Sequence, residues 1–304
     1  MNAFTRRSFL AGAAALSLRA ATLAERLGVV CQVSADETAT RATLRAAREA
    51  GFTRVQLQFS WVKADDAFLR ALPGWLKQEG VAGEVVGAYV NCVSPSNVLM
   101  DCRRQDLIRA IDFAGFIGAR RIVAWTGGYG KGLMTPDPRN WTREAEDAIC
   151  RFLEPYHPHI ENARLMLALE TYITLTCPDA PSLARLLKRL PKTTGAVMDP
   201  PNMTPIARYA QRDKVLKDMF GELKNRIALV HFKDFRLDAG GQSYQLPGPL
   251  KGETNYRLFA EHAVKLPPET PLIAEHLKPS EFAAARSQLL PLLESAAQRL
   301  SVSD

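Results

Sequence analysis

The 304-residue chain contains few cysteines, few histidines and no long hydrophobic run near its N-terminus. Its cysteines are odd in number and show no paired spacing, which argues against a structural zinc site or a disulfide framework: Cys31, Cys92, Cys102, Cys150 and Cys177. The N-terminal apolar run, residues 11–18, is about half the roughly 20 residues that a membrane-spanning helix requires. We therefore expect no permanent membrane span there.

The chain also lacks a strong charge of either sign. It has 39 basic and 32 acidic residues, a formal charge of +7. Residues 1–24 hold three arginines and no acid, so removing them leaves 36 basic against 32 acidic residues, or +4. This small excess of basic residues does not indicate nucleic acid or an anionic membrane as a partner. With 47% hydrophobic residues and no central linker, the chain predicts one domain with a full core.

The N-terminus resembles a twin-arginine export signal. Arg6 and Arg7 precede a weakly hydrophobic run, and small residues near Ala24 give a candidate cleavage point. We therefore expect residues 1–24 to be a signal read by the twin-arginine export machinery, and residues 25–304 to act in the periplasm or otherwise outside the cytoplasm. The alternatives are an ordinary amphipathic helix and a retained anchor.

From residue 27 onward, short apolar β-branched runs alternate with amphipathic helical patterns. The predicted strands are Leu27–Val33, Arg54–Phe59, Glu84–Asn91, Arg121–Trp125, Leu165–Glu170, Gly195–Asp199, Ile227–Lys233 and Pro271–His276. The predicted helices are Thr40–Ala50, Asp66–Glu79, Arg104–Phe116, Trp141–Asn162, Ser182–Leu190, Ala207–Leu223, Tyr256–Lys265 and Pro279–Leu300. This alternation predicts an α/β fold with a single (β/α)8 TIM barrel.

A doubly wound open sheet is the alternative fold. Such a sheet requires a glycine-rich phosphate loop after its first strand, and residues 32–36 contain no glycine. A glycine-rich segment, residues 127–132, follows the fourth predicted strand instead, and no helix opens directly on it. We expect this segment to be a mobile loop over the site.

Ionisable residues close four consecutive predicted strands, the fifth to the eighth: Glu170, Asp199, His231 and Glu275. Their separations are 29, 32 and 44 residues; one strand–helix unit takes about 30, and the last interval holds an extra loop at 237–254. Because side chains alternate faces along a strand, all four can point to the barrel axis at similar depth.

Three carboxylates meeting one imidazole would repel one another strongly unless they were protonated or bridged by a cation. The mixed oxygen and nitrogen donors suit one divalent metal ion, Mn²⁺, Mg²⁺, Co²⁺ or Zn²⁺. For any single residue of the four, a hydrogen-bonded or solvated position at the barrel rim is the alternative interpretation.

The four ligand candidates lie in four short motifs: Leu-Glu-Thr-Tyr (169–172), Met-Asp-Pro-Pro-Asn (198–202), His-Phe-Lys-Asp (231–234) and Ala-Glu-His (274–276). Together these motifs resemble those of the xylose-isomerase-like barrel superfamily, specifically its sugar-phosphate isomerase/epimerase group. The resemblance implies that Glu170, Asp199, His231 and Glu275 are the metal ligands. It also implies that Glu170 and Glu275 are the catalytic acid/base pair.

The resemblance also indicates residues around a substrate. Lys233 matches a lysine that contacts substrate oxygens, or else forms an ion pair with Asp234 or another carboxylate. Arg236 matches an anchoring arginine of some members, or else is a solvated loop residue. Tyr172 and Asn202 stand where many members have histidine, which leaves the ligands intact but changes the hydrogen bonding around the substrate.

The implied chemistry is abstraction of a proton next to a carbonyl, through an enediolate that a metal ion stabilises. Return of the proton to the same carbon gives epimerisation, return to the neighbouring carbon gives isomerisation, and loss of a leaving group gives elimination from an inosose or a 3-keto-glycoside. The sequence favours none of these. We expect a small carbohydrate-like substrate. Four aromatic residues near strand ends could stack on the sugar, or they could pack in the core instead: Trp125, Tyr172, Phe59 and Trp61.

Two other classes of function compete with an isomerase. Type-four apurinic endonucleases share this barrel but need several additional histidines, and the chain has only five. Of these, His157 and His159 belong to a predicted helix, and Asn202 stands where a zinc-binding histidine would be expected. The other competitor is a sugar-binding protein without catalysis, which would bind the same ligand but exchange no proton.

Overall fold

The computed structural model describes residues 21–96 and 98–302. In this part of the chain, eight parallel strands close into a barrel in the order β1-β10-β7-β6-β5-β4-β3-β2. The barrel strands are β1 (Leu27–Gln32), β2 (Arg54–Gln58), β3 (Ala82–Asn91), β4 (Arg121–Trp125), β5 (Met166–Glu170), β6 (Thr194–Met198), β7 (Ile227–Phe232) and β10 (Leu272–Ala274). The predicted single (β/α)8 TIM barrel is confirmed, and the open sheet is excluded.

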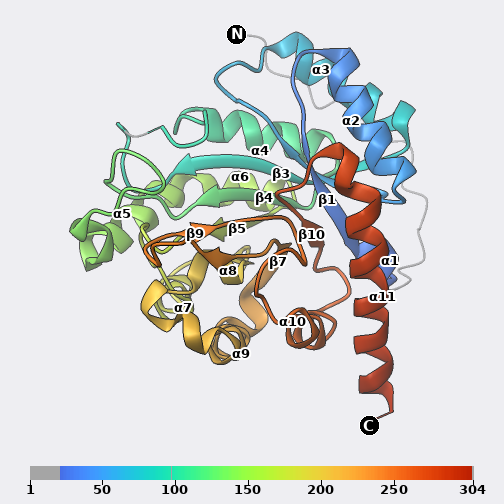
Figure 1. The fold of residues 1–304 in the computed structure, drawn as a ribbon. Coiled ribbons are helices and arrows are strands. Elements are labelled where there is room, and N and C mark those ends of the chain that lie inside the picture. The colour runs from blue at the N-terminus through green and yellow to red at the C-terminus, as the bar shows by residue number, and fades with distance from the viewer. Residues whose placement is uncertain (1–20, 97, 303–304) are drawn as a thin grey trace.

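Helices surround the barrel (Figure 1). They are α1 (Leu23–Arg26), α2 (Glu37–Glu49), α3 (Asp66–Glu79), α4 (Asp106–Phe116), α5 (Arg143–Leu153), α6 (His157–Asn162), α7 (Ala180–Leu187), α8 (Pro200–Met203), α9 (Arg212–Leu223), α10 (Tyr256–Ala263) and α11 (Phe282–Ser301). The long helix α11 packs against α2 and α10 and closes the ring where the last strand meets the first.

Local sequence signals explain where these elements begin and end. Asp65 caps the N-terminus of α3 through the Phe68 N–H, and Gly80 ends that helix in the left-handed conformation. Thr142 caps α5 in the same way. In strand β6, position 195 has no room for a side chain, because a Cβ there would lie 2.6 Å from the Arg226 carbonyl oxygen, and the residue is glycine.

The structure differs from the sequence prediction most clearly at two helices and one loop. The predicted helix 207–223 starts as a 3-10 segment, Ile206–Gln211, and becomes α-helical only in α9. The predicted helix 141–162 is divided into α5 and α6 by a 3-10 turn, Glu154–Tyr156, where Pro155 and Pro158 cannot donate the backbone hydrogen bonds of a continuous helix. The extra loop after β7 contains a small antiparallel hairpin outside the barrel, β8 (Arg236–Leu237) and β9 (Tyr244–Gln245).

The glycine-rich loop after β4 is tied down where it leaves the strand. The Asn91 side chain donates to the Gly128 carbonyl at 2.8 Å and accepts from the Gly128 N–H at 3.0 Å. The buried Asn140 accepts from the Tyr129 N–H at 2.7 Å and donates to the Thr174 carbonyl at 2.7 Å. The segment that we expected to be mobile is therefore anchored at its beginning.

The expected signal falls mostly outside the described residues, which begin at residue 21. The candidate cleavage point near Ala24 lies within α1. Directly after it, the buried Arg26 donates to the carbonyls of Thr270 and Ala263 and fixes this end of the chain to the barrel. Among the residues that the structure describes, no helix combines the length and apolar character needed to cross a membrane.

Candidate metal centre and active site

The four ligand candidates meet at the carboxyl ends of four neighbouring strands. Glu170 is the last residue of β5, Asp199 follows β6, His231 lies in β7 and Glu275 follows β10. Each of these side chains is buried, and none exposes more than 7% of its surface. Their positions at the carboxyl ends of neighbouring strands bring them together.

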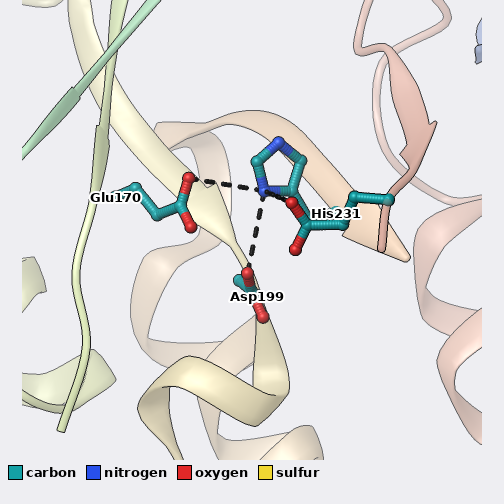
Figure 2. A group of neighbouring side chains, drawn as sticks. Glu170, Asp199 and His231 are labelled. Carbon is teal, nitrogen blue, oxygen red and sulfur yellow. Dashed lines mark ion pairs between the residues drawn. The ribbon is translucent and has the colours of Figure 1, made fainter. Parts of the chain in front are cut away.

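The three carboxylates converge on one nitrogen of the imidazole, and Figure 2 labels two of the residues that supply them, Glu170 and Asp199. His231 Nδ1 lies 3.4 Å from Glu170 Oε2, 3.7 Å from Asp199 Oδ2 and 3.4 Å from Glu275 Oε2. One ligand atom from each of the four residues can be chosen so that all lie within 4.8 Å of one another. In the described part of the chain, no other group of three or more Asp, Glu, His or Cys residues comes together in this way.

The donor atoms at this centre fit a cation. His231 Nδ1 and Glu170 Oε2 are buried and have no hydrogen-bond partner in the described residues. Unpartnered buried polar atoms are costly, and these two lie 3.4 Å apart, beside the carboxylates of Asp199 and Glu275. Because carboxylate oxygens and a neutral imidazole are ordinary ligands of divalent ions, Glu170, Asp199, His231 and Glu275 are the residues that would hold one.

Lys233 brings a positive charge to this centre. Its Nζ lies 2.7 Å from Asp199 Oδ2 and 2.8 Å from Glu275 Oε1. The buried ammonium group therefore bridges two of the ligand candidates. Asp234, the other partner considered for it, instead accepts the backbone N–H groups of Gly252 and Thr254 at 2.8 and 2.9 Å and anchors the loop after β7.

Asn202 orients Glu170. Asp199 caps the short helix α8, which begins with two prolines, and this tight turn places Asn202 beside β5. Asn202 Nδ2 donates to Glu170 Oε1 at 2.8 Å. One carboxylate oxygen of Glu170 is thereby held, and the other faces the centre.

The two glutamates have different protonation tendencies. Burial raises the pKa of Glu170 to about 7, although the nearby His231 partly opposes that rise. Burial also disfavours the charged form of Glu275, but His231 and Lys233 outweigh it and hold the pKa of that carboxyl well below its usual range. In the metal-free site, the pKa of Glu170 therefore lies near neutral pH, whereas Glu275 stays ionised.

The aromatic candidates lie at the inner wall of the site. Trp125 pairs with Glu170 across the β4–β5 ladder, and its buried Nε1 has no hydrogen-bond partner among the described residues. Tyr172 follows β5 and is also buried. Phe59 and Trp61 instead pack against each other, with ring centroids 4.6 Å apart, in the core between strands and helices.

The structure does not bring Arg236 to the four ligand candidates Glu170, Asp199, His231 and Glu275, called the quartet below. It lies on the hairpin strand β8, its side chain is exposed, and its Nε donates to Gln245 Oε1 at 2.8 Å. Its position agrees with the solvated alternative for this residue.

Sequence reasoning missed Gln56, whose amide contacts His231. Gln56 Oε1 lies 3.0 Å from His231 Nε2, and Gln56 Nε2 donates to the Tyr89 hydroxyl at 2.9 Å. The available signal was a glutamine in the middle of β2, a strand that is otherwise apolar at its buried positions. A polar side chain inside a parallel barrel needs a partner, because both faces of the strand are buried.

A closed parallel barrel with buried acidic and imidazole side chains at its carboxyl end defines a class of (β/α)8 proteins with a candidate metal centre. This chain belongs to the Xylose isomerase-like TIM barrel family, whose pattern it matches over residues 44–294. No curated protein sequence matches it closely enough to count as a relative.

Solved structures of low sequence identity share the fold. A xylose isomerase-like TIM barrel protein from Mycobacterium smegmatis, in complex with magnesium, is 19% identical with a TM-score of 0.65, covering 86% of this chain and 90% of that one. L-ribulose 3-epimerase is 13% identical with a TM-score of 0.68, covering 92% and 98%. Mannonate dehydratase from Streptococcus suis serotype 2 is 12% identical with a TM-score of 0.64, covering 90% and 95%.

Proposed function

We propose that the protein is a divalent-metal-dependent isomerase or epimerase of a sugar or keto-sugar, with Glu170 and Glu275 as acid and base. The observation that carries this proposal is the arrangement of the quartet. Its two glutamates come from β5 and β10, which β6 and β7 separate in the barrel, and each has an oxygen 3.4 Å from His231 Nδ1. Two carboxyl groups therefore approach one point from different sides.

A divalent ion held by the quartet would supply positive charge to stabilise negative charge on substrate oxygens. The protein supplies the proton transfers. Asn202 holds one oxygen of Glu170 and keeps the other facing the centre, where the carboxyl group can take up or return a proton. Glu275, held ionised by Lys233, is the base on the other side. The buried surroundings keep water from competing for these protons.

A neutral carbohydrate suits the site better than a phosphorylated one. Lys233 brings a cationic side chain to the quartet, but its ammonium group is already paired with two carboxylates. Trp125 Nε1 is a buried donor that lacks an acceptor in the described residues, and Tyr172 adds an aromatic wall. Together these groups favour a ligand with hydroxyl oxygens and a C–H face. The resemblance in fold to L-ribulose 3-epimerase supports the same substrate class.

Elimination is the second candidate, with a 3-keto-glycoside or an inosose as substrate. It is favoured by the unequal surroundings of the glutamates, because Lys233 pairs with Glu275 and keeps it ionised as a base, while one oxygen of Glu170 is free to protonate a leaving group. The fold shared with mannonate dehydratase supports it as well.

The test is to incubate the metal-loaded protein with ketoses, inososes and 3-keto-glycosides in D₂O and to follow deuterium incorporation and product formation by NMR. We expect exchange at the carbon next to the carbonyl with at least one substrate. Exchange should vanish in Glu170→Gln and Glu275→Gln, because each amide keeps the shape of the side chain but takes no proton. The matched control is Glu144→Gln on the exposed face of α5, which should retain full exchange.

Full exchange in both active-site variants would overturn the acid/base assignment. Binding of a sugar without any exchange across the panel would instead favour a sugar-binding protein. The products distinguish the two candidate reactions, since elimination releases a leaving group and epimerisation does not.

We also propose that residues 1 to about 24 direct export by the twin-arginine route, on the basis of Arg6, Arg7 and the apolar run that follows them. Replacing both arginines by lysine should leave the protein in the cytoplasm. Undiminished export of that variant, measured by cell fractionation, would show that another route is used.

A further inference from the structure

Gln56 reaches His231 from across the barrel. It is fully buried on β2, and two strands, β1 and β10, lie between it and β7. Gln56 Oε1 is 3.0 Å from His231 Nε2, the ring nitrogen that points away from the carboxylates (Figure 2). The imidazole therefore has a hydrogen-bonding partner on one side and three ligand candidates on the other.

The Tyr89 hydroxyl is the partner of the Gln56 amide NH₂ group. Gln56 Nε2 donates to this hydroxyl at 2.9 Å, and the amide oxygen on the other side faces His231. The Tyr89 ring is itself fixed, because it is buried and packs against Trp125 with ring centroids 5.2 Å apart. These contacts leave the amide oxygen as the group that His231 Nε2 meets.

An amide oxygen can only accept a hydrogen bond, so His231 Nε2 must carry the proton. A neutral imidazole then has its lone pair on Nδ1, which faces Glu170, Asp199 and Glu275. With the amide reversed, its NH₂ group would face Nε2 and the proton would sit on Nδ1, pointing at the cation site. The observed orientation is thus the one that makes Nδ1 a metal ligand.

We propose that Gln56 is a positioning residue that directs Nδ1 of His231 to the divalent ion, with Tyr89 as the partner of its amide NH₂ group. The inference rests on the metal-binding part of the proposed function. It assigns a role to two residues of β2 and β3, strands that contribute no ligand themselves.

The first test is ¹⁵N NMR of histidine-labelled full-length protein loaded with Zn²⁺, with the His231 signals identified by their loss in His231→Gln. We expect the proton on Nε2 and a metal-shifted, unprotonated Nδ1. A proton on Nδ1 in the zinc-loaded protein would overturn the inference, whatever the activity of the enzyme.

The second test is metal affinity by calorimetric titration with Mn²⁺. Gln56→Met keeps the size of the side chain but removes the acceptor, and we expect a loss of about 10- to 100-fold in affinity. Gln56→Glu restores an acceptor and should regain most of that loss. The matched control is Leu57→Ala on the same strand, whose side chain lies in the core between strands and helices; it should destabilise the fold but leave metal affinity unchanged.

The outcomes separate this inference from the proposed function. Wild-type affinity in Gln56→Met, or no recovery in a folded Gln56→Glu protein, would overturn the role of Gln56 and leave the metal-dependent reaction standing. Failure of the wild-type protein to bind Mn²⁺ or Zn²⁺ would overturn both.

Discussion

The ammonium group of Lys233 lies 2.7 Å from Oδ2 of Asp199, inside the barrel and away from solvent. Since the same group also reaches Glu275, it neutralises part of the negative charge that three carboxylates bring to one point. We predict that Lys233→Met destabilises the metal-free protein by about 3–5 kcal/mol, because it leaves these carboxylates buried without their partner. Added Mn²⁺ should recover much of the lost stability.

Urea unfolding with a chelator and with Mn²⁺ measures this effect. The matched control is Lys251→Met, which removes an exposed ion pair with Glu281 and should change little under either condition. A Lys233→Met protein as stable as the wild type without metal would show that the lysine does not balance the carboxylates.

A second prediction concerns the hydrogen bond from Asn202 to Glu170. Asn202→Ala should lower the rate of deuterium exchange by roughly 10- to 100-fold, because a hydrogen bond to a charged group is worth about 1.5–3 kcal/mol. Asn202→Asp should lower it further, since it replaces the donor by a second negative charge next to Glu170. An Asn202→Ala protein with an unchanged exchange rate would mean that Glu170 needs no such orientation.

Metal binding should depend on pH. In the metal-free protein, burial disfavours the charged form of His231, but the Glu275 and Glu170 carboxylates outweigh it and raise the pKa of His231 to about 9. Below that pH the imidazole carries a proton that the metal must displace. Affinity for Mn²⁺ should therefore rise about tenfold per pH unit between pH 7 and 9 and then level off.

Calorimetric titration in buffers of different ionisation enthalpy measures the protons released on binding. We expect about one proton at pH 8, and more near pH 7 and below, where Glu170 is also partly protonated. Affinity that does not change between pH 7 and 9 would contradict the environment assigned to His231.

A fourth prediction concerns the anchored loop after β4. Asn140 holds the Tyr129 N–H and the Thr174 carbonyl, so Asn140→Ala should speed amide hydrogen exchange at Tyr129 by at least about tenfold. The Thr126 N–H, which donates to the Glu170 carbonyl at 2.7 Å, provides an internal reference that should stay protected. Equal protection of Tyr129 in the variant and the wild type would show that the loop is held by other contacts.

The barrel and its quartet were predictable because both follow from local patterns. Alternation of strands and helices sets the number of strands, and an ionisable residue at the end of a buried strand is conspicuous. The strand register places Trp125 opposite Glu170, and it places Ile273, two residues before Glu275, opposite His231. Period and spacing were sufficient here because each relation involves adjacent strands.

The contacts that tune the site were not predictable, because they join residues far apart in the chain. Gln56 and His231 are 175 residues apart and meet only once the barrel closes. The partners of Lys233 depend on side-chain direction at the barrel mouth, where Lys233 reaches Asp199 and Glu275 and Asp234 accepts from the loop after β7. The break between α5 and α6 could have been predicted from Pro155 and Pro158.

The central claim is that Glu170, Asp199, His231 and Glu275 bind one divalent ion. Its most direct test is titration of chelator-treated protein with Mn²⁺, with free Mn²⁺ counted by electron paramagnetic resonance. The account predicts about one bound ion per chain in the wild type and strongly reduced binding in folded Asp199→Ala and His231→Ala proteins. Stoichiometric, tight binding in the protein that lacks both side chains would contradict it.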